Sequence, residues 1–296
     1  MGNPKATDLS TLEPGLYLVA TPIGAARDIT LRALDILSSA DVLAAEDTRT
    51  LRKLMDIHGI ARRERPTVSL HDHNARQAIP KLIAALKSGK SVAYASDAGT
   101  PLISDPGYEL TRAVIDDGLH LISAPGATAA ITALTLSGLP ADNFFFAGFL
   151  PTKTGRRKTA LGGLKDLPGT LIFYESPKRA AGMLHDAAEV LGPERRAALC
   201  REITKKFEET LRDTLGNLAK DVAGRTLKGE IVILVGQGDS EDLNQTDLDQ
   251  EILDALKEVS VRDAADSIAV KFGLKKRDVY QRALALNALE QDDEIE

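Results

Sequence analysis

Three loops rich in glycine and proline follow predicted strand ends, and their composition suits them to hold a small ligand. They are Thr21-Pro22-Ile23-Gly24, segment 96–107 (SDAGTPLISDPG) and segment 124–129 (APGATA). Glycine lets a backbone approach a ligand closely and proline fixes its path, so main-chain N–H and C=O groups are exposed to an adenosine or amino-acid moiety. Open α/β sheets bind ligands beyond the carboxyl ends of their strands, where these loops lie. For each loop taken alone, a rigid structural loop is the alternative.

The loops match neither common phosphate-binding fingerprint, and metal ligands are scarce. None has the G-x-G-x-x-G spacing of a dinucleotide fold or the lysine-containing Walker sequence. His71 and His73 are close together, but no third histidine or cysteine lies near them, so we expect no metal site. Cys200 is the single cysteine, and on an apolar predicted strand it is expected to be a small core residue.

The elements that must position these loops alternate between short apolar strands and amphipathic helices. The predicted strands of the first half are Gly15–Thr21, Val42–Ala45, Thr67–Leu70, Ser91–Ala95 and His120–Ser123. The predicted helices are Ile29–Ser38, Thr48–Asp56, Ala78–Leu86, Gly107–Asp117 and Ala127–Leu136. Such alternation implies right-handed crossovers and a largely parallel sheet, which is typical of the α/β class.

A second α/β domain and a small helical module follow. The predicted strands are Asn143–Phe149, Thr170–Glu175, Arg196–Cys200, Glu208–Leu215 and Glu230–Val235, and the predicted helices are Arg156–Leu164 and Arg179–Leu191. The polar segment 236–246 has the composition of a linker. Beyond it we expect a helix at Leu248–Val259, then a helix–turn–helix of Val261–Phe272 and Lys275–Leu286. The predicted domains are residues 13–138, 139–238 and 247–289.

Composition and charge exclude several classes of protein. The 296 residues are 43% hydrophobic, and 37 basic against 43 acidic side chains give a net charge of −6. This composition fits a folded protein of two or three domains and opposes a disordered chain. One cysteine excludes a disulfide framework and suits a reducing cytosol. The polar N-terminus lacks the apolar core of an export signal. Segment 121–141 is uncharged but contains two prolines and two glycines, so we expect a buried strand, loop and helix there and no membrane span.

Several runs, taken together and in order, resemble the S-adenosylmethionine-dependent tetrapyrrole methylase superfamily. They are the three loops, the run Glu46-Asp47-Thr48-Arg49, the run 173–177 (FYESP) with Arg179, and the run 201–209 (REITKKFEE). The last two resemble one branch of the superfamily, the bacterial 16S ribosomal RNA cytidine 2′-O-methyltransferases. The resemblance covers roughly residues 15–236, and the C-terminal helices also fit this branch.

The resemblance implies two α/β domains with S-adenosylmethionine held folded in the cleft between them, and a homodimer. Carried over position by position, seven residues would line the cofactor cleft: Pro22, Ala98, Gly99, Thr100, Ile103, Thr128 and Ala129. The last two begin a predicted helix, whose first N–H groups can bind a carboxylate. Many relatives have Asp where this chain has Thr100, so one side-chain carboxylate is missing here.

Methylation of a ribose hydroxyl needs a base, because the hydroxyl is a poor nucleophile near neutral pH. Glu46, Asp47 and Glu175 are the main candidates, since each stands at or just beyond the end of a predicted strand. Further candidates are Asp97, Glu202, His71 and Lys205. A helix cap by Asp47, or a structural pair of Asp47 with Arg49, is the structural alternative.

Two clusters of basic side chains predict RNA contacts. The first is segment 152–165, which carries five basic residues and no acid, and the second lies at the turn and second helix of the C-terminal module. Contacts of this kind grip phosphate and supply affinity rather than sequence recognition. A solvated helix face or a protein contact is the alternative. The residues expected to meet RNA are Arg49, Lys153, Arg156, Arg157, Lys158, Arg179, Lys275, Lys276 and Arg277.

The sequence therefore predicts a cytoplasmic enzyme that methylates the ribose 2′-hydroxyl of a cytidine in 16S ribosomal RNA, as naked RNA or within the small subunit. The net charge of −6 does not oppose this, because the 7 basic and 13 acidic side chains of residues 247–296 account for all of it. A corrin or porphyrin C-methyltransferase is one alternative, opposed by the extended basic segment. An RNA-binding assembly factor without catalysis is the other, opposed by the intact cofactor loops.

Overall fold

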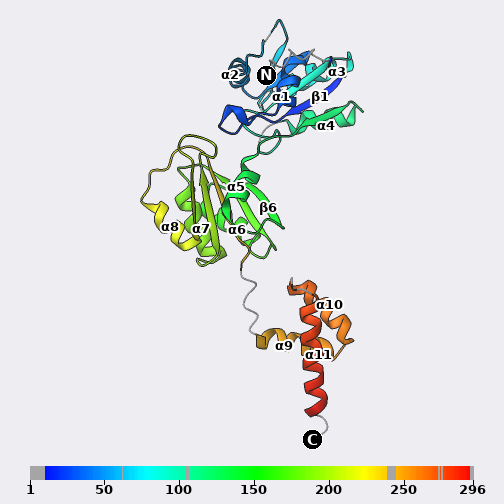
Figure 1. Ribbon diagram of the computed structural model, residues 1–296, viewed down its shortest axis with the longest axis vertical. Helices are drawn as coiled ribbons and strands as arrows, with labels where there is room; N and C mark the ends of the chain where they lie inside the picture. Colours follow the sequence, from blue (N-terminus) through cyan, green and yellow to red (C-terminus); the bar gives the residue numbers. More distant parts are fainter. Residues whose placement is uncertain are drawn as a thin grey trace, which may run out of the picture.

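A computed structural model of the protein describes residues 11–61, 63–71, 73–104, 107–238, 245–272, 274 and 276–293. Within these residues the chain forms two five-stranded sheets, each with its own helices, followed by a group of three helices (Figure 1). The mixed α/β architecture with a parallel first sheet confirms the predicted fold class.

The first sheet is entirely parallel and has the strand order β3-β2-β4-β1-β5. Its strands are β1 (Gly15–Val19), β2 (Val42–Ala45), β3 (Thr67–Ser69), β4 (Ser91–Ala95) and β5 (Leu121–Ala124). The connecting helices are α1 (Leu31–Ser39), α2 (Thr48–Ile57), α3 (Ala75–Lys87) and α4 (Tyr108–Asp116), with a short 3-10 helix at Ala26–Asp28. Because β4, β1 and β5 are neighbours, the three predicted ligand loops leave the same edge of the sheet side by side.

Helices cover both faces of this sheet, which is why its central strands read as continuous apolar runs. Leu37 of α1 and Met55 of α2 pack on one face, and Leu82 of α3 and Leu110 of α4 pack on the other. All five residues of β4 are buried. Thr30 caps α1 by accepting a hydrogen bond from the Ala33 N–H.

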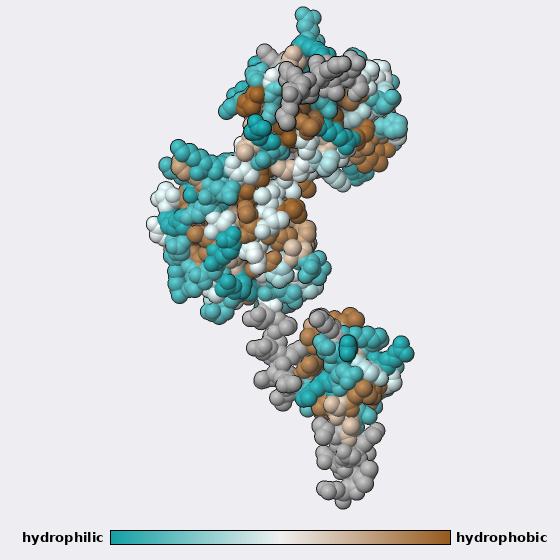
Figure 2. Space-filling model, viewed as in Figure 1, coloured by the Kyte–Doolittle hydropathy of each residue, from teal (hydrophilic) through white to brown (hydrophobic). Residues whose placement is uncertain are grey.

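Helix α5 (Ala129–Ser137) follows β5 in the chain but packs on the second sheet. Its residues Ala130, Ala133 and Leu134 share a hydrophobic cluster with Ile172 and Leu234 of that sheet. The predicted domain limit at residue 138 therefore falls after a helix whose packing belongs to the second domain. In Figure 2 apolar residues gather at the junction of the two domains, where this helix crosses.

The second sheet has the order β6-β7-β10-β8-β9, parallel between β6 and β7 and antiparallel elsewhere. Its strands are β6 (Phe144–Phe149), β7 (Thr170–Glu175), β8 (Arg196–Arg201), β9 (Glu209–Thr214) and β10 (Ile231–Val235). Helices α6 (Thr154–Gly162), α7 (Ala180–Leu191) and α8 (Leu215–Ala223) pack on one face, and α5 covers the other. Cys200 is buried in the layer beneath α5, which confirms its predicted core position.

Helix α8 is absent from the sequence-based prediction, which extends a strand to Leu215. The strand ends at Thr214 because the Thr214 side chain accepts a hydrogen bond from the Asn217 N–H and caps the helix. Leu215, Leu218 and Val222 then supply its buried face. Gly216 inside the helix hides this pattern from a propensity argument.

The C-terminal helices form a small core of their own, centred on Ile252, Ala265 and Ile268. They are α9 (Gln245–Leu256), α10 (Val261–Phe272) and α11 (Lys276–Asp293). Helix α11 is longer than predicted. Among the described residues, none of the helices combines the length and the apolar character that crossing a bilayer requires.

Candidate active site between the two domains

The three loops at the edge of the first sheet are joined by hydrogen bonds. Thr21 and Gly99 exchange two backbone bonds, from the Thr21 N–H to the Gly99 oxygen (2.9 Å) and from the Gly99 N–H to the Thr21 oxygen (3.1 Å). The Thr100 hydroxyl donates to the Ala127 carbonyl oxygen at 3.0 Å. The Ser96 hydroxyl donates to the Gly99 oxygen at 2.7 Å. The loops after β1, β4 and β5 are therefore joined in one assembly.

The loop after β4 needs glycine at one position and stores strain at two others. Gly99 has φ of +83°, and a Cβ there would lie 3.2 Å from Ile23 Cγ2 and 3.4 Å from the Ala127 oxygen. Leu102 and Ser104 also have positive φ, +74° and +65°. Left-handed backbone at residues other than glycine is unfavourable and is found disproportionately at ligand sites.

A cavity of about 400 Å³ lies between this loop assembly and the second sheet. Its volume is within the range of small-molecule sites. Six of the seven residues predicted for the cofactor line it: Ala98, Gly99, Thr100, Ile103, Thr128 and Ala129. Pro22 is the seventh and is not among the lining residues, whereas its neighbour Ile23 is. The remaining lining residues are Ser104, Phe149, Tyr174, Glu175, Ser176, Pro177, Gly229, Glu230, Ile231 and Val232.

Two aromatic residues of the second domain, Phe149 and Tyr174, line the cavity and were not among the predicted site residues. Tyr174 packs edge to face against Phe146 (ring centroids 4.8 Å apart) and Phe149 (5.7 Å). Its hydroxyl oxygen accepts a hydrogen bond from the Ala130 N–H at 3.2 Å, which fixes the ring against the first turn of α5. The position of Tyr174 in the FYESP run was the available signal. Its contact with α5 depends on tertiary packing.

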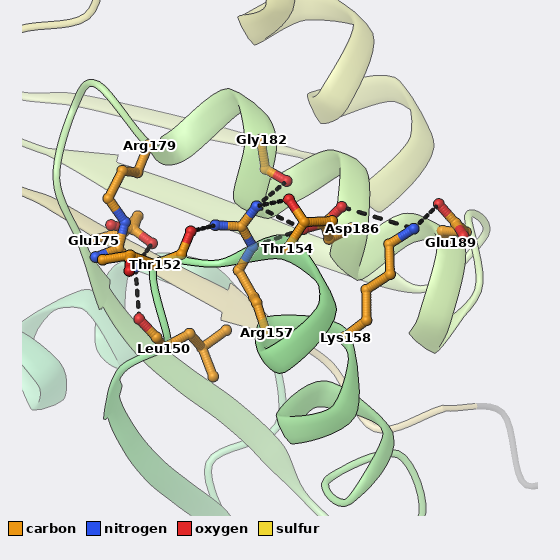
Figure 3. A network of polar contacts seen from close by, with 10 residues as sticks. All are labelled: Leu150, Thr152, Thr154, Arg157, Lys158, Glu175, Arg179, Gly182, Asp186 and Glu189. Carbon is orange, nitrogen blue, oxygen red and sulfur yellow. Dashed lines mark hydrogen bonds and ion pairs between the residues drawn. The ribbon is translucent and has the colours of Figure 1, made fainter.

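Glu175 lines the cavity, and its side chain is fully buried. One oxygen accepts the Ser176 N–H at 2.7 Å, and the other accepts from the Arg179 guanidinium at 3.0 Å. Arg179 also donates to the Leu150 carbonyl oxygen at 2.6 Å (Figure 3). The guanidinium predicted to meet RNA therefore fixes Glu175 in place, although a quarter of its side chain stays exposed.

Glu46 and Asp47 lie one strand farther along the sheet edge and are not among the residues lining the cavity. Asp47 caps α2 by accepting the Arg49 N–H at 2.8 Å, and its carboxylate also pairs with the Arg49 guanidinium at 2.6 Å. The side-chain hydrogen bond from Arg49 lowers the pKa of Asp47 to about 2. This geometry supports the structural interpretation of Asp47, because a carboxylate with so low a pKa is a weak base. The Asp47 N–H in turn donates to Asp97 at 3.0 Å.

The REITKKFEE run connects the two domains. The Thr204 hydroxyl oxygen accepts a hydrogen bond from the Ala25 N–H at 3.0 Å, and a Cβ on Gly24 would lie 2.5 Å from that oxygen. Lys205 Nζ bridges Glu202 (3.0 Å) and Glu230 (2.8 Å). Burial favours a higher pKa for Glu202, but the hydrogen bonds from Lys205 and from the Glu230 N–H outweigh it and lower the pKa.

The basic segment 152–165 divides into buried and exposed members, and its prediction needs a correction. Arg157 is buried, and its guanidinium lies 2.6 Å from the buried carboxylate of Asp186 (Figure 3). The RNA contact predicted for Arg157 is therefore wrong, because its helical phase turns it toward α7 rather than toward solvent. Lys158 pairs with Glu189 at 2.6 Å. Lys153 and Arg156 are exposed and have no ion-pair partner among the described residues.

The C-terminal basic cluster is also partly neutralised. Lys276 pairs with Asp266 at 2.6 Å and Arg282 pairs with Asp249. Arg277 is exposed and has no ion-pair partner within the described part of the chain. Lys275, also predicted to meet RNA, lies outside the described residues.

Comparisons with known proteins agree with the geometry. Residues 15–219 match the family profile for tetrapyrrole (corrin/porphyrin) methylases, and residues 242–287 match the RsmI C-terminal HTH domain. The chain is 52% identical to the ribosomal RNA small subunit methyltransferase I of Mesorhizobium japonicum over 93% of both chains. It is 42% identical to the protein of that name from Haemophilus influenzae, over 94% of this chain and 98% of the other.

Solved structures show the same fold at low identity. A cobalt precorrin-4 methyltransferase aligns with a TM-score of 0.56 and 16% identity, covering 75% of this chain and 94% of the other. A uroporphyrin-III C-methyltransferase from Thermus thermophilus, complexed with S-adenosyl homocysteine, aligns with a TM-score of 0.53 and 18% identity, covering 75% and 97%. The chain thus belongs to the tetrapyrrole methylase family, and within it to the group that contains the ribosomal RNA small subunit methyltransferase I proteins.

Proposed function

We propose that this protein uses S-adenosylmethionine to methylate the ribose 2′-hydroxyl of a cytidine in 16S ribosomal RNA. The observation that carries the proposal is the cavity of about 400 Å³ between the two domains, with the buried carboxylate of Glu175 in its wall. The substrate follows from relatives at 42–52% identity that are named ribosomal RNA small subunit methyltransferases. The structural relatives that modify tetrapyrroles are far more distant, at 16–22% identity.

The residues of the cavity fit the cofactor. Gly99 lines the cavity, and its φ of +83° suits glycine, so the loop can present its backbone to a ligand there. Ile103 offers an apolar surface for a nucleoside or a methionine chain. Thr128 and Ala129 open α5, where N–H groups without intrahelical acceptors attract a carboxylate. When bound, the cofactor supplies a methyl group on a positively charged sulfur.

Glu175 is the residue that we assign to the hydroxyl proton. Each of its oxygens accepts one hydrogen bond from the protein, and a carboxylate oxygen can accept a second. A ribose hydroxyl donating to that free position would be oriented for attack and would lose its proton to the carboxylate. Arg179 holds the carboxylate in place. Glu46 and Asp47 remain secondary candidates, since neither lines the cavity.

The RNA backbone is gripped by the exposed cations of both domains. Arg49, 87% exposed, extends from the start of α2, and Lys153 and Arg156 extend from the start of α6. Contacts of this kind bind phosphate without recognising sequence, so they suit a large folded RNA or the small subunit itself. We place the enzyme in the cytoplasm, with its substrate.

We also propose a homodimer. Strand β6 is an edge of the second sheet, and its residues Phe144 and Phe145 are each 45% exposed. Apolar side chains on an exposed strand edge are a liability unless another chain covers them. Sedimentation velocity at micromolar concentration is expected to show a dimer. A monomer would refute this part of the proposal without affecting the chemistry.

The experiment supplies labelled cofactor and small ribosomal subunits that lack the modification, then digests the RNA to nucleosides. The expected product is 2′-O-methylcytidine. Label on a base, or on an added tetrapyrrole, would refute the proposal. Glu175→Gln is expected to lower kcat by about 100-fold or more while cofactor affinity stays near that of the wild type. Glu46→Gln is the matched control and is expected to retain more activity.

A further inference from the structure

The segment 202–208, called here the 202–208 loop, is held in an unfavourable conformation by many contacts. Glu202 and Thr204 have φ of +51° and +64°, although neither is glycine. The Thr204 N–H donates to the Glu208 carboxylate at 2.5 Å, and the Lys205 N–H donates to the Glu202 carbonyl oxygen at 2.9 Å. Strained backbone persists only where surrounding contacts enforce it, and such places are often functional.

The tip of this loop exposes an aromatic ring beside a cation. Phe207 is 63% exposed, and Lys206 Nζ lies 5.6 Å from the centre of its ring. Lys206 has no ion-pair partner among the described residues. The neighbouring acids are already engaged: Glu202 by Lys205, and Glu208 by the loop backbone. The tip therefore presents one apolar ring and one uncompensated positive charge to solvent.

The loop is attached to the wall of the cavity. Lys205 binds Glu230, which lines the cavity, and Thr204 binds the Ala25 N–H at the loop after β1. The contacts of Thr204 and Lys205 thus anchor the loop that carries Phe207 to the cavity wall at Glu230 and to the loop after β1.

We propose that Phe207 is a stacking platform for the base of an unpaired nucleotide of the RNA substrate, and that Lys206 binds the adjacent phosphate. The inference rests on the proposed function and names the subsite that positions the substrate. RNA is recognised mainly where its bases are unpaired and can stack on aromatic side chains. A ring that lies open beside a cation offers stacking and charge attraction together, independently of base identity.

The test measures methyl transfer to small ribosomal subunits lacking the modification, using four variants. Phe207→Ala is expected to raise the KM for the subunit by roughly 5- to 100-fold, from the usual worth of one stacked base. Phe207→Tyr keeps the ring and is expected to behave like the wild type. Phe207→Leu keeps apolar bulk without a ring and is expected to resemble Phe207→Ala. Lys206→Ala is expected to reduce the slope of log K against log salt concentration for RNA binding by the amount that one phosphate contact contributes.

Cofactor affinity, measured by calorimetry, is expected to be the same in all four variants, which also shows that each is folded. A wild-type KM in Phe207→Ala, or full rescue by Phe207→Leu, would overturn the proposal. A change in sedimentation of Phe207→Ala would overturn it too, because the ring would then contact a protein chain. If the wild type transfers no label to ribose, the proposed function itself fails. If it does and Phe207→Ala matches it, only this inference fails.

Discussion

Replacing Arg157 with alanine is expected to destabilise the second domain rather than weaken RNA binding. The Arg157 guanidinium and the Asp186 carboxylate are 7% and 4% exposed and lie 2.6 Å apart. The same guanidinium donates to the Thr152 carbonyl oxygen at 3.3 Å and approaches the Thr154 hydroxyl (Figure 3). Removing Arg157 would leave Asp186 buried without its main counter-charge.

The size of the effect follows from that burial. Breaking a buried ion pair by removing one partner costs about 3–5 kcal/mol. Lys158 Nζ lies 4.0 Å from the other oxygen of Asp186 and offsets part of the loss, so we expect about 3 kcal/mol. For a domain of about 100 residues that corresponds to a Tm lower by roughly 12–24 °C. Replacing both partners, as in Arg157→Met with Asp186→Leu, is expected to recover most of the loss.

The assay compares two adjacent arginines. Thermal unfolding and the salt dependence of RNA binding are measured for Arg157→Ala and for Arg156→Ala. Arg156 is exposed, so its variant is expected to keep the wild-type Tm and to lower the salt slope by about 0.7–0.9 if it meets one phosphate. Arg157→Ala is expected to lower the Tm and to leave the salt slope at the wild-type value. An unchanged Tm together with a flatter salt slope in Arg157→Ala would refute the structural role.

Two other changes have defined outcomes. Gly24→Ala places a methyl group 2.5 Å from the Thr204 hydroxyl oxygen, so it is expected to cost about 1–3 kcal/mol of stability and to weaken cofactor binding in calorimetry. Gly155→Ala is the control: its methyl group lies in open space within α6, so stability and cofactor binding are expected to stay at the wild-type level. The folded pKa of Asp47, about 2, lies below its ordinary 3.8, so its charge contributes stability above about pH 4 that is lost as the pH falls toward 2. Urea titrations of the wild type and Asp47→Asn are therefore expected to give a difference in unfolding free energy that is constant from pH 7 to 5 and shrinks below pH 4. An unchanged difference at pH 3 would contradict the pairing with Arg49.

The first sheet was predictable because its central strands are buried on both faces and its helices have one apolar face. Ser91–Ala95 is apolar enough to be identified without context, and the loops that follow strands were placed by their glycines and prolines. The helical phase of α6 indicates which arginine is buried: Arg157 is four residues from the buried Leu161, so both lie on the inner face. Charge alone does not distinguish that position from Arg156.

The second-domain wall could not be predicted in the same way. Gly229 and Glu230 reach the cavity only because β10 lies between β7 and β8, and this strand order has no local signal in the sequence. Asp47 carried two consistent interpretations, base or helix cap, until its hydrogen bonds with Arg49 were known. Hydrophobic periodicity indicates neither the order of the strands in a sheet nor the direction in which a side chain points.

Helix α5 belongs to the first domain by chain order and to the second by packing, and this has a mechanical consequence. A motion that widens the cavity would bend the chain between β5 and α5, because the helix is fixed on the second sheet, and it would break the hydrogen bond from the Thr100 hydroxyl to the Ala127 oxygen. Thr128 and Ala129 would then travel with the second domain while Gly99 stays with the first. Ligand entry and release would thus separate two halves of one binding wall, and a bound cofactor that contacts both would hold the hinge closed.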